Sequence, residues 1–158
     1  MFKQIETNLS KKKEPMPKVP DSSKPIETLK IILDSNALFV QLELKIDIFE
    51  ETKRLLNRNL DFVLLSSVKR ELELLATKNS PKTRREATYA LKLAEKCRLV
   101  AVENPEKLST DDVIVKVSKA WDSPVFTNDR QLRKRLKDIS VPVIYVRQKS
   151  RLDIDGLI

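Results

Sequence analysis

Short apolar runs alternate with longer amphipathic stretches from about residue 29 onward. In the amphipathic stretches apolar positions recur every three or four residues, which predicts helices, whereas the compact runs predict buried strands. The predicted strands contain KIIL (30–33), DFVLLS (61–66), RLVAV (98–102), SPVFT (123–127) and VPVIYV (141–146). The predicted helices cover about 43–58, 67–78, 81–97, 110–121 and 129–138. Because strands alternate with helices, we expect an α/β fold, in which a mainly parallel five-stranded sheet lies between two helical layers.

Residues 1–28 follow a different pattern. They carry three consecutive lysines at 11–13 and prolines at 15, 17, 20 and 25, with few large apolar residues. Such a segment can bury little apolar surface, and its prolines disfavour regular elements. We therefore expect a flexible basic tail at 1–28 and a single folded domain at 29–158.

The residue types that the chain lacks exclude several classes of function. It contains no histidine, which excludes Ser-His-Asp catalysis and histidine-dependent zinc sites. Its only glycine is Gly156, so it has neither a P-loop nor a dinucleotide-binding fingerprint. Its only cysteine, Cys97, lies among apolar helical positions and is expected to be a buried thiol. The sequence has no membrane-length apolar run and no secretory signal, which predicts a soluble, cytoplasmic protein.

The charge of the chain favours a polyanionic partner. Lysine and arginine number 31 against 23 aspartates and glutamates, which gives a net charge of +8. An excess of this size is typical of proteins that bind nucleic acid. The alternative is that the surplus lysines only keep the protein soluble.

Two acidic positions lie beside the first two predicted strands, where open α/β sheets gather their ligand-binding residues. Asp34 directly follows the first strand, and Glu71 lies at the edge of the apolar stripe of the helix after the second. Each also has a purely structural interpretation, Asp34 as a turn cap and Glu71 as the solvated partner of a nearby cation. If the acids converged, their mutual repulsion would call for divalent cations, which oxygen ligands hold.

Further acids open two later helices. Asp111 and Asp112 follow a serine in a sequence that approximates a capping box, so one can cap the helix while the other faces the site. We favour Asp112 as the ligand. Asp129 follows the fourth strand, where Thr127 or Asn128 can cap the next helix and leave Asp129 free to face the cleft.

A basic ridge begins beside this last acid. Its first four cations recur at helical spacing on the side opposite to two leucines, and almost no acid interrupts them. A charge run is ordinarily a solvated face, but a track for a phosphate backbone is the sharper interpretation. The expected RNA-binding residues are Arg130, Arg133, Lys134, Lys137, Arg147 and Lys149.

At these positions the chain resembles the PIN-domain nucleases, and most closely their ribosomal-RNA-processing subfamily of archaea and eukaryotes. The resemblance covers roughly 30–158 and rests on LDSNAL, VKRELELL, STDDVIV, FTNDRQLRKRL and the terminal VPVIYVRQKSRLDIDGLI. Each motif is short, but four acidic motifs in the same order form a specific set. The positions that match the family pattern are Asp34, Glu71, Asp112 with Val115, and Thr127 with Asp129.

The resemblance implies a three-layer PIN-like domain with a twisted sheet and a metal-dependent endoribonuclease activity. Metal-activated water would attack a phosphodiester of RNA, with a small-subunit ribosomal RNA precursor as the expected substrate. A second copy of the chain or ribosome-assembly proteins would be its protein partners. The implied catalytic residues are Asp34, Glu71, Asp112 and Asp129. The implied ligands of Mg²⁺ or Mn²⁺ are these four and Asp111, with Asn36, Thr127 and Asn128 in support.

Three other functions fit the same residues. A toxin ribonuclease of the VapC kind has a similar acidic site but cleaves selected transfer or messenger RNA under the control of an antitoxin. A catalytically weak PIN domain would bind RNA as a scaffold within a processing complex. A structural α/β domain would use the acids only as caps, and would not respond to divalent ions.

Overall fold

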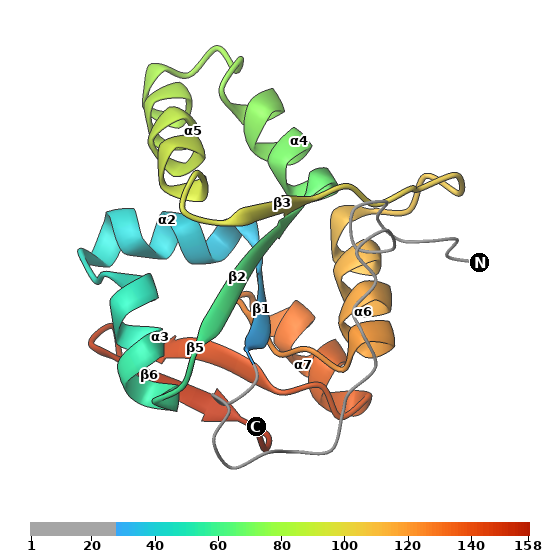
Figure 1. The fold of residues 1–158 in the computed structure, drawn as a ribbon. Coiled ribbons are helices and arrows are strands. Elements are labelled where there is room, and N and C mark those ends of the chain that lie inside the picture. The colour runs from blue at the N-terminus through green and yellow to red at the C-terminus, as the bar shows by residue number, and fades with distance from the viewer. Residues whose placement is uncertain (1–27) are drawn as a thin grey trace.

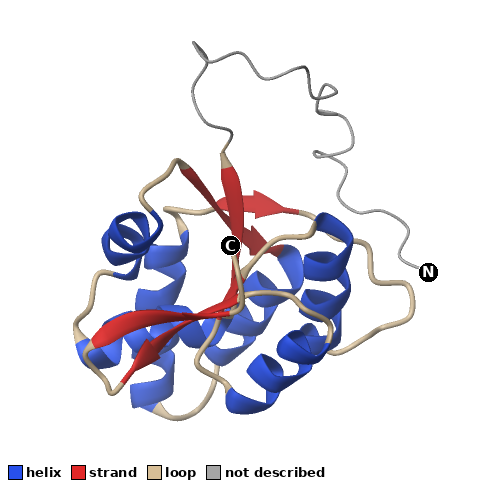
Figure 2. Cartoon of the chain, turned by 90° about the horizontal axis from the view of Figure 1, so that it is seen from below, coloured by secondary structure: helices blue, strands red, loops and turns tan. Residues whose placement is uncertain are grey.

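A twisted six-stranded sheet forms the centre of residues 28–158, the part of the chain that the computed structural model describes. The strands are β1 (Leu29–Leu33), β2 (Leu60–Leu65), β3 (Arg98–Val100), β4 (Val125–Phe126), β5 (Val143–Arg147) and β6 (Arg151–Asp155). Their order is β3-β2-β1-β4-β5-β6, and only the β5–β6 pair is antiparallel. The strands rotate along the sheet, so that β3 and the β5–β6 hairpin lie across β1 and β2 (Figures 1 and 2). The predicted basic tail falls outside the described residues except for Thr28.

Helices cover both faces of this sheet. They are α2 (Ser35–Leu44), α3 (Ile48–Leu56), α4 (Ser66–Leu75), α5 (Pro81–Ala94), α6 (Thr110–Trp121) and α7 (Arg130–Asp138). Strands β2 and β3 are added on one side of β1, and β4, β5 and β6 on its other side. Because crossovers between parallel strands are right-handed, α2 to α5 therefore fall on one face of the sheet and α6 and α7 on the other. Figure 1 shows α2, α3 and α5 on one side of β1 and β2, and α6 and α7 on the opposite side. The predicted three-layer α/β fold is confirmed. None of the described helices is long and apolar enough to cross a membrane.

Two elements were not predicted from the sequence. Helix α2 begins directly after Asp34, whereas the sequence predicted one helix at 43–58, which corresponds to α3. The residues of α2 are apolar on most sides because the helix packs on both β1 and α5, so no single apolar stripe marks it. Strand β6 adds a sixth strand through a turn in which Gln148 and Lys149 have φ values of 54° and 60°. Positive φ at successive turn residues matches the twist of a hairpin, which explains how β6 folds back on β5.

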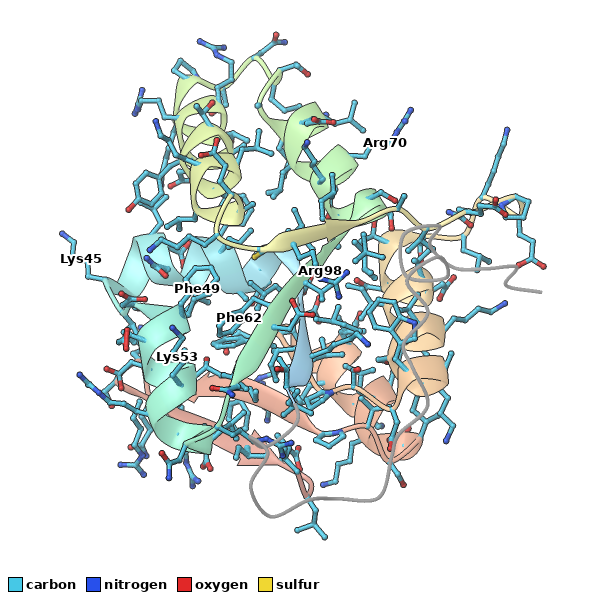
Figure 3. All side chains as sticks on the ribbon, viewed as in Figure 1. Lys45, Phe49, Lys53, Phe62, Arg70 and Arg98 are labelled. Carbon is cyan, nitrogen blue, oxygen red and sulfur yellow. The ribbon has the colours of Figure 1, made fainter. Side chains whose placement is uncertain are left out.

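The core joins the sheet to both helical layers. Ile31, Ile32 and Leu33 of β1 are fully buried, as are Leu132 and Leu136 of α7. Burial of each such side chain contributes roughly 1.5–3 kcal/mol. On the other face Phe49 of α3 packs against Phe62 of β2, with ring centroids 4.9 Å apart and an interplanar angle of 80° (Figure 3). This packing fixes the strands, and with them the residues that follow each strand.

The strand order reverses between β1 and β4, which lie side by side. Leu33 at the end of β1 pairs with Phe126 at the end of β4. The next residues, Asp34 and Thr127, therefore emerge at the same edge of the sheet. In open α/β sheets the crevice at such a reversal is where ligands bind.

Candidate active site

Asp34 is the one charged side chain that is buried within residues 28–158, with 4% of its surface exposed. It occupies the N-cap position of α2, but its carboxylate makes no capping hydrogen bond to that helix. Instead, its Oδ2 accepts a hydrogen bond of 2.7 Å from the hydroxyl of Thr127. Burial of a carboxylate is unfavourable unless strong partners compensate it. The interpretation of Asp34 as a simple turn cap therefore does not account for its position.

Glu71 reaches the same edge of the sheet from α4. Val68 and Leu72 anchor this helix in the core, which leaves Glu71 half-buried at the boundary. Its Oε1 accepts a hydrogen bond of 3.1 Å from the hydroxyl of Ser35, the residue after Asp34. Glu71 is thus held beside Asp34 by a neutral donor.

Thr127 and Asp129 connect β4 to α7. The buried hydroxyl of Thr127 donates to Asp34 and accepts the backbone N–H of Asp129 at 3.0 Å. Asp129 itself caps α7, because its Oδ1 accepts from two backbone N–H groups of the first turn at 2.9 and 3.2 Å. The expectation that Thr127 or Asn128 would cap this helix is therefore wrong. The Oδ2 atom of Asp129 takes no part in these capping bonds.

Two asparagines tie the ends of β1, β4 and β5 together. The backbone N–H of Asn128 donates to Oδ1 of Asn36 at 2.8 Å. The side chain of Asn128 accepts the N–H of Val146 at 2.6 Å and donates to its carbonyl at 3.4 Å. Asn128 therefore mimics a strand residue where β4 has already ended. This arrangement is consistent with the supporting role predicted for both asparagines.

The two acids that open α6 have different surroundings. The predicted cap is present, since Oγ of Ser109 accepts the backbone N–H of Asp112 at 3.1 Å. The carboxylate of Asp112 accepts a hydrogen bond of 2.8 Å from Arg135 of α7, and this bond lowers the pKa of Asp112. Partial burial and the negative charge of Asp129 raise the pKa of Asp111. From these contacts we infer that Asp111 faces the site, whereas the sequence favoured Asp112; the choice between the two acids stays a prediction.

Electrostatic interactions link Asp34 to Asp111 and Glu71, and link Asp111 to Asp129. Burial raises the pKa of Asp34 to about 6, the hydrogen bond from Thr127 opposes this rise, and the charges of Asp111 and Glu71 add to it. The negative charge of Asp129 in turn contributes to the raised pKa of Asp111. Neighbouring carboxyl groups with raised pKa values, here Asp34 and Asp111, are typical of functional sites.

The chemistry of these side chains fits a hard divalent cation. Carboxylate oxygens are the ligands that Mg²⁺ and Mn²⁺ prefer. Within the described residues, no three His, Cys, Asp or Glu side chains lie close enough to form a ready cage for one ion. Mg²⁺ does not require such a cage, since it usually keeps several waters and takes one or two carboxylates. The buried carboxylate of Asp34, with like charges around it, is therefore compatible with such an ion.

The predicted basic ridge lies on α7 and on the β5–β6 hairpin. Arg130, Lys134, Lys137 and Lys149 are exposed. Arg133 instead packs on Tyr145 of β5, with its guanidinium carbon 3.9 Å from the ring centroid. Arg147 is exposed and forms an ion pair with Asp153 at 2.7 Å. The ridge therefore combines exposed surface cations with two arginines that neighbouring side chains hold in place.

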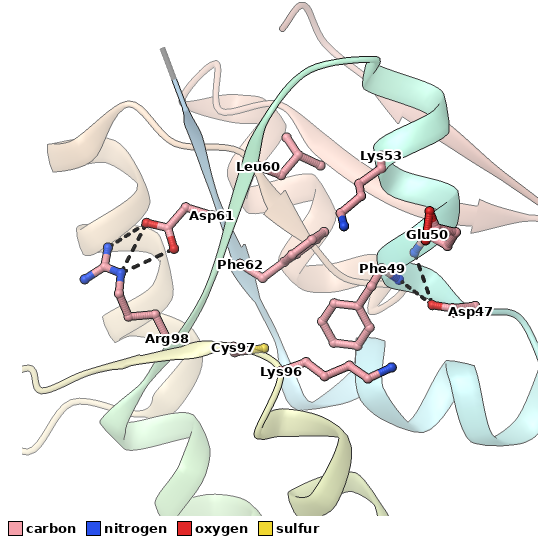
Figure 4. Close-up of a pocket in the computed structure, with 10 residues that line it drawn as sticks. All are labelled: Asp47, Phe49, Glu50, Lys53, Leu60, Asp61, Phe62, Lys96, Cys97 and Arg98. Atoms are coloured by element: carbon pink, nitrogen blue, oxygen red, sulfur yellow. Dashed lines mark hydrogen bonds and ion pairs between the residues drawn. The ribbon is translucent and has the colours of Figure 1, made fainter. Parts of the chain in front are cut away.

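A pocket of about 560 Å³, shown in Figure 4, has none of these acids in its lining. It is lined by the first residues of β2 and β3 and by α3, so it lies at the amino ends of the parallel strands, opposite Asp34. Its Asp61 carboxylate accepts hydrogen bonds from Arg98, the shortest of 2.8 Å. Burial raises the pKa of the half-buried Cys97 thiol to about 12, so this thiol is unreactive. This pocket therefore lacks the features of a reaction centre.

Three residues that shape the site were missed by the sequence reasoning. Ser35 holds Glu71, and its position directly after Asp34 was the available signal. Arg135 neutralises Asp112, and Tyr145 supports Arg133. No local pattern marks these last two contacts, because they depend on how α7 packs against α6 and β5.

Comparison with known proteins agrees with this geometry. The model of a family described as a PIN like domain matches residues 31–149. Ribonuclease VapC4 of Methanocaldococcus jannaschii is 30% identical over 129 residues, which cover 82% of this chain and 98% of that protein. Ribonuclease VapC9 of Archaeoglobus fulgidus is 30% identical over 96 residues, which cover 61% and 68%. The solved structure of the PIN domain endonuclease Utp24 has a TM-score of 0.69 and 25% identity, and covers 82% of this chain and 92% of that one.

The chain belongs to the PIN-like domain family. The match contains all the candidate acids and both asparagines. The predictions of a PIN-type fold and of a PIN-domain enzyme are confirmed. The curated relatives are VapC ribonucleases, so they support the VapC-type alternative better than the predicted role in ribosomal RNA processing.

Proposed function

We propose that this protein is a divalent-metal-dependent endoribonuclease with its reaction centre at Asp34. The observation that carries the proposal is a buried carboxylate at the reversal of the strand order, whose pKa the charges of Asp111 and Glu71 help to raise. Similarity to two ribonucleases over most of the chain supports RNA as the substrate. The excess of positive charge favours the same polyanion.

Asp34, Glu71, Asp111 and Asp129 would hold the Mg²⁺ or Mn²⁺, with Asp34 at the centre. When bound, such an ion supplies Lewis-acid chemistry for hydrolysis, because it makes water a stronger nucleophile and offsets charge on the leaving oxygen. The hydroxyl of Thr127 orients Asp34 by donating a hydrogen bond to its carboxylate. The chemistry requires neither a histidine nor a covalent enzyme intermediate.

Exposed cations would hold the RNA beside these acids. Arg130 directly follows Asp129, and Lys134 and Lys137 continue along the exposed side of α7. Contacts from such residues to phosphates position RNA without reading its sequence. Affinity should therefore fall as the salt concentration rises.

The class of RNA is inferred from the relatives. Two VapC ribonucleases match the chain in sequence, which favours a VapC-type nuclease that cleaves selected cellular RNA. Processing of a small-subunit ribosomal precursor is the second candidate. It rests on the motifs LDSNAL and FTNDRQLRKRL, with support from the likeness to a PIN domain endonuclease.

Mapped cleavage of total cellular RNA would test the proposal. The protein is incubated with Mg²⁺, with Mn²⁺ or with EDTA, and the new RNA ends are sequenced. We expect discrete metal-dependent cuts that are lost in Asp34→Asn. A matched control is Asp122→Asn, because Asp122 lies at the end of α6 with a φ of 55°, a conformation that asparagine tolerates.

The positions of the cuts separate the candidate functions. Cuts in transfer or messenger RNA support the VapC-type nuclease, and cuts at a precursor junction of ribosomal RNA support the processing role. RNA that both the wild type and Asp34→Asn bind equally but do not cut would contradict the nuclease and favour the scaffold. Cuts that persist in Asp34→Asn would refute Asp34 as the centre.

A further inference from the structure

A second pocket opens between α7 and the β5–β6 hairpin, and its lining includes both chain neighbours of Asp129, Asn128 and Arg130. It has a volume of about 430 Å³, within the roughly 300–1,000 Å³ range of small-ligand pockets. Its lining combines three arginines with an aromatic ring and two amides. The lining residues include Asn128, Arg130, Arg133, Tyr145, Arg147 and Gln148.

Two of the three arginines are held in place by other side chains. Arg147 forms a hydrogen-bonded ion pair with Asp153 at 2.7 Å. The guanidinium carbon of Arg133 lies over the ring of Tyr145, 3.9 Å from its centroid, and its Nε is 3.9 Å from a carboxylate oxygen of Asp155. Arg130 is exposed and has no ion-pair partner among residues 28–158. The pocket therefore presents a fixed guanidinium plane and a free cation.

One wall of this pocket is part of the framework of the active site. The side chain of Asn128 makes two hydrogen bonds to the backbone of Val146, while its backbone N–H donates to the side chain of Asn36. The preceding residue, Thr127, holds Asp34. The pocket is therefore rigidly connected to the acids, and an RNA strand along α7 would pass both.

We propose that this pocket is a subsite for one unpaired nucleotide of the RNA, next to the cleaved bond. The nucleobase stacks on the outer face of the Arg133 guanidinium, which Tyr145 supports from behind, and Arg130 binds the adjoining phosphate. Gln148, exposed at the hairpin turn, is placed to hydrogen-bond the edge of the base. Unpaired RNA is the fitting partner, because stacking on an arginine plane needs a base face that a duplex hides. This inference rests on the proposed endoribonuclease function.

Metal-free binding tests the subsite separately from cleavage. A fluorescent ten-nucleotide RNA is titrated with the full-length protein in EDTA, both single-stranded and annealed to its complement. Arg133→Ala should weaken binding of the single strand about tenfold, in the range expected for one lost base stack, and should change duplex binding much less. Arg85→Ala, which removes an exposed arginine of α5 on the other face of the sheet, is the matched control.

Arg133→Lys distinguishes a stacking plane from a mere positive charge. Lysine retains the charge and most of the stem but not the planar guanidinium. We expect Arg133→Lys to lose most of the affinity that Arg133→Ala loses, while both variants keep the thermal unfolding profile of the wild type. Wild-type affinity in Arg133→Lys, or equal weakening of single-stranded and duplex RNA, would overturn the subsite. Metal-dependent cleavage that requires Asp34 would still support the nuclease in that case.

Discussion

At the scale of single residues, the buried carboxylate of Asp34, which we propose as the reaction centre, also destabilises the folded protein. The pKa of Asp34 in the folded protein is about 6, whereas its ordinary value is 3.8. Between these pH values the folded state binds a proton that the unfolded chain releases, so the free energy of unfolding falls as the pH rises. A difference of about two pKa units corresponds to about 3 kcal/mol, which is the upper limit of the loss at neutral pH.

Asp34→Asn should therefore make the protein more stable and inactive. At pH 7.5 without divalent ions, we expect the free energy of unfolding to rise by up to about 3 kcal/mol, because the buried charge is gone. At pH 4 the wild type and the variant should nearly coincide. Urea denaturation at both pH values measures this, and a variant that is less stable than the wild type at pH 7.5 would contradict the account.

Adjacent acids at the start of α6 should differ in function. Substitution of a residue that only hydrogen-bonds to a metal ligand typically lowers activity roughly 10–100-fold. Asp111→Asn should lower the cleavage rate by more than this. Asp112→Asn should leave the rate nearly unchanged, because this side chain is exposed and paired with Arg135. The comparison uses single-turnover cleavage with saturating Mg²⁺. The opposite order of effects would restore Asp112 as the ligand.

At the scale of elements, the start of α7 has two functions that overlap in Asp129. One carboxylate oxygen caps the helix, and the negative charge contributes to the acidic site. Asparagine caps helices as well as aspartate does, but it carries no charge. The cap and the charge can therefore be separated by substitution.

Asp129→Asn should keep the stability of the protein and lose most of its cleavage activity. Asp129→Ala should lose activity and also about 1 kcal/mol of stability, because the first turn of α7 is left without its acceptor. Thermal unfolding and cleavage of the same RNA measure the two effects. If Asp129→Asn cleaves at the wild-type rate, Asp129 acts only as a cap.

The elements also show how far the sequence could predict this protein. The alternation of apolar runs was sufficient for five strands, because each is a compact buried segment. Helix α2 could not be found by periodicity, since it is buried on more than one side. The pairing of Asp112 depends on Arg135, which lies 23 residues away in the sequence and meets it only in the folded protein. Positions along the chain were thus predictable, whereas partners across the fold were not.

At the scale of the whole molecule, a bound ion should compensate the repulsion among the acids. Any ligand that binds only the folded state stabilises it, by about 2.7 kcal/mol at a concentration 100 times its Kd. We expect Mg²⁺ or Mn²⁺ to raise the melting temperature of the wild type at pH 7.5. Asp34→Asn should show little of this rise, and Asp122→Asn should show all of it. An equal shift in Asp34→Asn and the wild type would mean that the ions bind elsewhere.

The hydrogen bond between Thr127 and Asp34 joins residues that are 93 positions apart. A chain leaving the ribosome exposes β1 long before β4, and Asn128 cannot be held until β5 has paired beside it. The candidate active site is therefore assembled only when nearly all of the domain has been synthesised. During translation the nascent chain lies beside its own messenger RNA and the RNA of the ribosome. We expect that it cannot cleave either of them before its synthesis is nearly complete.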